Sequence, residues 1–86
     1  MDILLTDTQS LKDKRSILSR IKNQVRNKFN VSVAVLKYGN LIGRALLGIA
    51  CINNDSRIVH QVLRQVENVV ENQPGVQVLE RKVELI

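Results

Sequence analysis

The sequence predicts a small α+β domain in which strands and helices follow one another in the order β-α-β-β-α-β. Two long segments repeat apolar residues at the 3.6-residue period of a helix, and four shorter apolar segments between turn residues are typical of strands. A chain of 86 residues supports one hydrophobic core of modest size. We therefore expect a single domain over residues 1–86.

The N-terminal part of the chain predicts a strand followed by a helix. Met1 to Thr6 is short and mostly apolar, and a polar run follows it. Ser10 offers a helix N-cap, and Asp13 three residues later completes a pattern similar to a capping box. The expected helix extends from Ser10 to Lys28. Apolar residues at helical spacing form one stripe along the helix and up to its end: Leu11, Ile17, Leu18, Ile21, Val25 and Phe29.

The remainder of the chain predicts a hairpin, a second helix and a last strand. Val31 to Leu36 and Arg44 to Ile52 are apolar, and the turn-rich sequence KYGNLIG joins them as a hairpin. Asn54 or Asp55 then caps a second helix, which Pro74 and Gly75 end, and Val76 to Ile86 follows as the last strand. The second helix carries one broad apolar face: Ile58, Val59, Val62, Leu63, Val66, Val69 and Val70.

This order of elements predicts how they pack. In a chain this short, right-handed crossovers place both helices on one face of a four-stranded antiparallel sheet, which is the ferredoxin-like arrangement. The second and third strands are apolar on both faces, although a sheet face in contact with water should carry polar residues. We therefore expect a second copy of the chain to cover that face and form a homo-oligomer. The expected core is Leu18, Ile21, Val25, Leu47, Ile49, Val59, Val62, Leu63 and Val66.

Composition excludes several classes of protein. Cys51 is the one cysteine, so no intrachain disulfide and no cysteine cluster for a metal can form, which fits a reducing cytosol. No apolar run approaches the roughly 20 residues of a membrane span, and the N-terminus lacks the pattern of a signal peptide. We therefore expect a soluble, cytoplasmic protein without a membrane role.

The positive charge is concentrated on the first helix. The net charge is +5, and it favours an acidic partner: nucleic acid, an anionic membrane surface or an acidic protein. Asp13 is the one acid between Ser10 and Lys28, where the sequence has seven basic residues: Lys12, Lys14, Arg15, Arg20, Lys22, Arg26 and Lys28. The excess charge therefore lies on one element.

Part of this charge forms a row beside the apolar stripe. Helical spacing places Lys12, Arg15, Ser19, Lys22 and Arg26 on one flank, over roughly 21 Å. A row of this length suits several successive phosphates. The alternative is a solvated face whose long side chains only cover apolar surface with their stems. In the binding hypothesis Lys22 and Arg26 are the central anchors, Lys12 and Arg15 extend the row, and Arg20, Lys14 and Lys28 are peripheral.

The remaining residues indicate which binding modes and which kinds of chemistry to expect. Phe29 and Tyr38 are the only aromatic residues, so a sheet that stacks several bases is not expected. His60 is expected on the surface and Cys51 as a small core hydrophobe. Arg44 either extends the basic surface or pairs with a carboxylate such as Glu80 or Glu84. The sequence has no glycine-rich phosphate loop, carboxylate pair or nucleophile–base arrangement, so we expect no enzyme, cofactor or metal site.

Three stretches carry a resemblance to a known family. SLKDKRSILSRIKNQVRNKFNVSVA, RALLGIACINND and the closing VLERKVELI resemble the YlxP-like family, bacterial domain-of-unknown-function family 503, over nearly the whole chain. The resemblance implies a ferredoxin-like fold and no established activity. It also implies an association with translation, because genes of the family tend to lie beside those for translation initiation and ribosome maturation factors.

The sequence departs from this family at three places. Members usually have several more residues before the first helix, so this chain is expected to begin partway into its first strand. Members often have an acidic residue where this chain has Val35, and a Trp-Gln pair where it has Ile42 and Gly43. No role that depends on those polar groups is carried over.

The functional hypothesis is a small non-enzymatic factor that binds structured RNA, and ribosomal particles are the expected source of that RNA. Its site is the basic face of the first helix: Lys12, Arg15, Lys22, Arg26 and Arg20. Phosphate contacts would supply affinity with little base discrimination. The alternatives are a homodimeric interaction module whose basic helix meets an acidic protein, and a ligand-binding regulatory domain.

Overall fold

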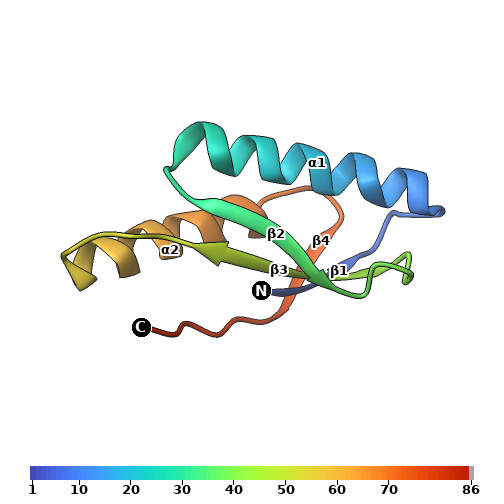
Figure 1. Cartoon of the computed structure of the whole chain (residues 1–86). Helices are drawn as coiled ribbons and strands as arrows, with labels where there is room; N and C mark the ends of the chain where they lie inside the picture. Colours follow the sequence, from blue (N-terminus) through green and yellow to red (C-terminus); the bar gives the residue numbers. More distant parts are fainter. Residues whose placement is uncertain (86) are drawn as a thin grey trace.

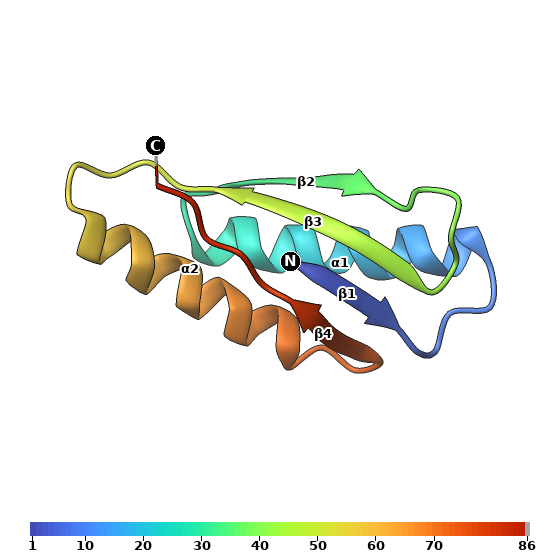
Figure 2. The same cartoon turned by 90° about the horizontal axis from the view of Figure 1, so that it is seen from below.

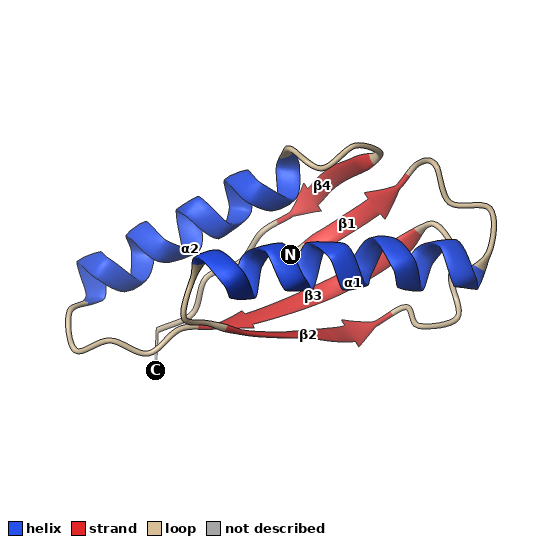
Figure 3. Cartoon of the chain, turned by 90° about the horizontal axis from the view of Figure 1, so that it is seen from above, coloured by secondary structure: helices blue, strands red, loops and turns tan. Residues whose placement is uncertain are grey.

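The computed structural model describes residues 1–85, and it contains the six predicted elements in the predicted order (Figure 1). They are β1 (Asp2–Leu5), α1 (Leu11–Lys28), β2 (Ser32–Lys37), β3 (Arg44–Ala50), α2 (Ser56–Glu71) and β4 (Val76–Glu80). The strands form one antiparallel sheet in the order β2-β3-β1-β4. Both helices cover the same face, so the strands lie in front in Figure 2 and the helices in Figure 3. The ferredoxin-like fold is confirmed.

The predicted N-cap starts α1. The Ser10 hydroxyl accepts a hydrogen bond from the Asp13 N–H at 3.1 Å, and the Asp13 carboxylate accepts one from the Gln9 N–H at 3.3 Å. In a standard capping box the N3 side chain accepts the N–H of the N-cap residue itself, whereas here Asp13 accepts the N–H of Gln9, one residue before the N-cap Ser10. These contacts satisfy backbone donors that the first helical turn leaves without partners. They also keep the carboxylate of Asp13 at the N-terminal end of the helix.

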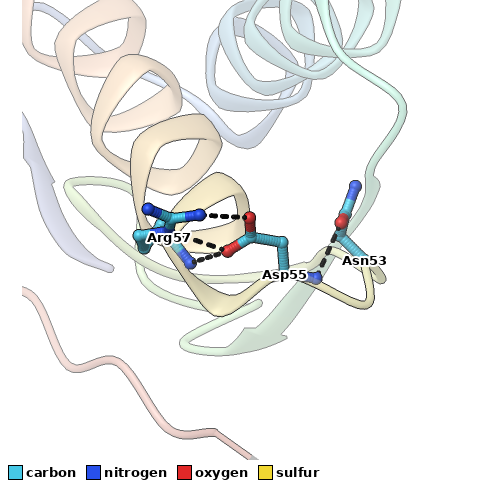
Figure 4. Close-up of polar contacts among 3 residues, drawn as sticks. All are labelled: Asn53, Asp55 and Arg57. Carbon is cyan, nitrogen blue, oxygen red and sulfur yellow. Dashed lines mark hydrogen bonds and ion pairs between the residues drawn. The ribbon is translucent and has the colours of Figure 1, made fainter.

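Asp55, the second of the two predicted residues, caps α2. Its carboxylate accepts the Arg57 N–H at 2.9 Å, and the Arg57 guanidinium pairs with the same carboxylate at 3.1 Å (Figure 4). Asn53 supports the cap, because its side-chain oxygen accepts the Asp55 N–H at 2.9 Å. After α2 the chain turns through Gly75, whose φ of 74° favours glycine. A Cβ there would also lie 2.7 Å from a carboxylate oxygen of Asp7.

The core lies between the helices and the sheet. The largest fully buried side chains are Ile3, Ile21, Val25, Leu47, Val66 and Val70. Most of the predicted core is confirmed, because Leu18, Ile21, Val25, Leu47, Val59 and Val66 are buried, and Ile49 and Val62 pack against the cluster. The prediction for Leu63 was wrong. It is only partly buried, because it lines an open hollow between α2, β3 and the residues that follow β4.

The last strand is shorter than predicted. It ends at Glu80, and the predicted strand residues Arg81 to Leu85 have no strand structure; Ile86 lies outside the described residues. β4 is an edge strand that pairs only with β1, and Asp2 is opposite Glu80 at the end of this pairing. The short β1 therefore sets the length of β4, because a strand needs a neighbour to bond its backbone.

Candidate functional site

The basic row of α1 lies beside the free edge of the sheet. β2 is an edge strand, and α1 packs over it in the opposite direction. Arg26, near the end of α1, donates a hydrogen bond from Nη2 to the Val33 carbonyl at 2.9 Å. The contact therefore holds the C-terminal end of the row against the edge strand β2.

A groove separates α1 from β2 and the turn that follows it. It has a volume of about 470 Å³. We call it the α1–β2 groove, and its lining residues are Leu11, Lys14, Arg15, Leu18, Ser19, Lys22, Val35, Gly39 and Asn40. Of the predicted site residues, the groove brings together Arg15 and Lys22, with Ser19 between them in the sequence. Lys12, Arg20, Arg26 and Lys28 do not line it.

The cations of this face are not neutralised by nearby acids. Lys12, Arg15, Arg20 and Lys28 are exposed and Lys22 is half-buried. Within residues 1–85 none of these five side chains takes part in an ion pair. No carboxylate of the described residues 1–85 lines the α1–β2 groove. Its electrostatic potential is therefore positive, and apolar walls of low dielectric strengthen such a potential.

Lys14 was predicted as a peripheral charge, and the structure corrects this. The residue is only 3% exposed, and its ammonium donates hydrogen bonds to the carbonyls of Tyr38 and Leu41. Burial lowers the pKa of this amine. Lys14 precedes the buried Leu18 by one helical turn, so it lies on the apolar stripe. This spacing was the signal that could have found it.

Arg44 does not extend the basic surface. It forms a two-point ion pair with Asp2, with Nε–Oδ1 at 3.0 Å and Nη2–Oδ2 at 2.6 Å. Its guanidinium also lies 4.3 Å from the ring centre of Tyr38. The hydrogen bond to Arg44 lowers the pKa of Asp2, and the same bond raises the pKa of Arg44. Its partner is thus Asp2 rather than the predicted Glu80 or Glu84.

The sheet face away from the helices carries apolar side chains. Leu36 is 62% exposed and lies over Gly48, where an added Cβ would be 2.7 Å from a Leu36 methyl carbon. A hollow of about 300 Å³ adjoins it, lined by Ser32, Val33, Ala34, Leu36, Gly48, Ile49 and Ala50. Charged residues line a second hollow beside Leu46: Asp2, Lys37, Glu80 and Lys82. The apolar part of this face is therefore the patch around Leu36 and Gly48.

The remaining candidates carry little chemistry. His60 is exposed, as predicted. Cys51 is a free thiol that is only half-buried and does not belong to the core cluster, because β3 ends at Ala50. Among the described residues, no three His, Cys, Asp or Glu side chains come together as metal ligands would. Neither of the two described helices combines the length and apolarity needed to cross a membrane.

Comparison with known proteins identifies relatives along nearly the whole chain. A family model described as "Protein of unknown function (DUF503)" matches residues 1–83. The chain is 32% identical over 76 residues to the uncharacterized protein YlxP of Bacillus subtilis (strain 168), and this alignment covers 88% of the chain and 83% of YlxP. Neither match names an activity or a ligand.

Proposed function

Since this chain belongs to the DUF503 family of proteins of unknown function, we propose its function from its own surface: a small non-enzymatic factor that binds RNA through the basic face of α1. The observation that carries the proposal is the row of cations beside the α1–β2 groove. A solvated helix face usually mixes both signs of charge. Here the one acid of the helix, Asp13, bonds a backbone N–H at the helix end instead.

The proposed binding mode is contact with phosphates rather than with bases. Phosphate contacts give affinity and position a protein on RNA, and they carry little sequence information. Base stacking needs accessible aromatic faces, but the ring of Tyr38 is in contact with Arg44 and Phe29 is packed against the core. Structured RNA in ribosomal particles is the proposed target, because the family's gene neighbourhood associates it with translation.

The test compares two double variants with the same change in net charge. Arg15→Gln with Lys22→Gln removes the two more accessible of the three cations that line the groove and leaves the buried Lys14 in place, whereas Lys37→Gln with Arg64→Gln removes two exposed cations outside α1. Arg26 stays unchanged, because it bonds the Val33 carbonyl and its loss could disturb the fold. Affinity for ribosomal particles is measured at several salt concentrations.

We expect the variant with Arg15→Gln and Lys22→Gln to bind ribosomal particles more weakly and with a smaller dependence on salt concentration. Each lost phosphate contact should reduce the log–log salt slope by about 0.7–0.9. The variant outside α1 should change both quantities less. Equal losses in the two variants would mean that only net charge matters. An absence of parent binding at low salt would contradict the RNA proposal and favour an acidic protein partner.

A second observation favours a second candidate, self-association through the open sheet face. The exposed Leu36 and the adjoining hollow lie on the same surface. In a two-fold dimer each copy presents the same patch, so Leu36 of one copy can enter the hollow of the other. The basic faces of α1 would then point outward on both copies. This arrangement is compatible with RNA binding and would provide two binding surfaces.

A further inference from the structure

Lys14 raises a question that the fold alone does not answer. A charged amine is costly to bury unless hydrogen bonds compensate for lost water. The ammonium group has three N–H donors, and the described residues provide two acceptors, the carbonyls of Tyr38 and Leu41. One donor is therefore without a protein partner, on a side chain that also lines the α1–β2 groove.

The groove offers several other donors near this amine. Arg15 and Lys22 are two helical turns apart, roughly 10 Å along the axis, and Ser19 contributes a hydroxyl between them. The opposite wall is formed by Gly39 and Asn40, which belong to the turn that Lys14 holds. All the charged side chains that line the groove are cations.

We propose that the α1–β2 groove is a phosphate-binding site, with the buried Lys14 in its wall and the more exposed Arg15 and Lys22 beside it. The inference rests on the proposed function for the source of the phosphate, a phosphodiester of RNA. The volume of about 470 Å³ lies within the ~300–1,000 Å³ of small-molecule sites, so it can hold a phosphate with part of its nucleotide. Lys14 supplies a fixed charge that solvent screens little.

Gly39 permits a test that removes none of these groups. A Cβ at Gly39 would have no atom within 4 Å, and its φ lies outside the left-handed region, so a side chain is tolerated there. Gly39→Glu places a negative charge at the wall of the groove, and Gly39→Gln adds a neutral side chain of nearly the same size. The two variants therefore differ in charge while the native cations stay in place.

Inorganic phosphate is the first probe, and its binding to the parent is measured by amide chemical shifts in NMR spectra. We expect saturable shifts at Ser19, Gly39 and Asn40, retained in Gly39→Gln and lost in Gly39→Glu. With ribosomal particles as the second probe, Gly39→Glu should bind about tenfold or more weakly than Gly39→Gln. Circular dichroism and thermal unfolding verify that both variants fold.

The outcomes distinguish this inference from the proposed function. Saturable phosphate binding without any binding of ribosomal particles supports the site and overturns the proposed RNA function. Binding of ribosomal particles that is equal in Gly39→Glu and Gly39→Gln overturns the groove site and leaves the RNA function standing. A polyglutamate peptide that shifts the same amides when phosphate does not would also overturn the inference, in favour of a carboxylate ligand.

Discussion

The ammonium of Lys14 bonds the carbonyl of Leu41, a residue 27 positions later in the chain, and so fixes the turn between β2 and β3 to α1. The same ammonium bonds the Tyr38 carbonyl at the start of that turn. Tyr38 has a φ of 67°, in the left-handed region that non-glycine residues seldom adopt. The lysine therefore stabilises a turn whose backbone is not intrinsically favoured.

The first prediction is that replacing Lys14 with methionine destabilises the protein. Lys14→Met keeps the buried stem but leaves two turn carbonyls without their donor, which should cost about 1–3 kcal/mol of unfolding free energy. Urea unfolding measures this loss. Lys12→Met, an exposed position on the same helix, is the control and should change stability by less than about 0.5 kcal/mol. Equal effects would show that Lys14 contributes no more than a surface lysine.

The Asp2–Arg44 pair predicts a specific acid sensitivity. Its hydrogen bond lowers the pKa of Asp2 below the ordinary 3.8 of the unfolded chain. The pair's contribution to stability is therefore complete above pH 3.8, and it declines as pH falls from 3.8 through the lower pKa of the folded state. Asp2→Asn should be less stable than the parent near pH 6, and this difference should shrink below pH 3.8. A difference that is constant from pH 6 to pH 2 would contradict the pairing.

The partner of Arg44 illustrates the difference between what the sequence can predict and what it cannot. The order of elements follows from hydrophobic period and turn residues, and both helix caps follow from Ser10 and Asp55. Asp2 and Arg44 are 42 residues apart, and they meet only because β1 lies between β3 and β4. Arg44 is opposite Leu4 and Asp2 is opposite Leu46, so the pair is a diagonal contact across two strands. Sequence spacing does not determine such a contact until the strand register is known.

The candidate site, like the fold, could be predicted from the sequence only in part. Helical spacing placed Arg15, Ser19 and Lys22 on one flank, and the structure brings these three to the same groove. The other wall comes from Gly39 and Asn40, and its position depends on how β2 packs against α1. The burial of Lys14 depends on carbonyls of that wall. A helical pattern describes one element, so it cannot identify a lysine whose acceptors come from another.

Two of the three leucines predicted for the core, Leu47 and Leu63, should respond differently to truncation. Leu47 is fully buried on β3, so Leu47→Ala should cost about 2–5 kcal/mol. Leu63 is only partly buried beside the C-terminal residues, so Leu63→Ala should cost about 1 kcal/mol, because less apolar surface is lost and water can fill the space. Denaturant unfolding of both variants provides the comparison. A cost for Leu63→Ala equal to that for Leu47→Ala would mean that this part of α2 is more deeply covered than the structure indicates.

The last prediction concerns the open sheet face. If Leu36 inserts into the hollow of a second copy, light scattering should detect a dimer at micromolar concentration, and Leu36→Glu should shift it to monomer. An ionised carboxylate in an apolar interface loses hydration without gaining a partner. Leu36 is 62% exposed in the single chain, so the substitution should leave the fold intact. Ile52→Glu is the matched control, because Ile52 is 96% exposed, lies beyond the end of β3 and does not line the hollow. A dimer that persists in Leu36→Glu but dissociates in Ile52→Glu would place the interface elsewhere, and a monomeric parent would contradict self-association through this face.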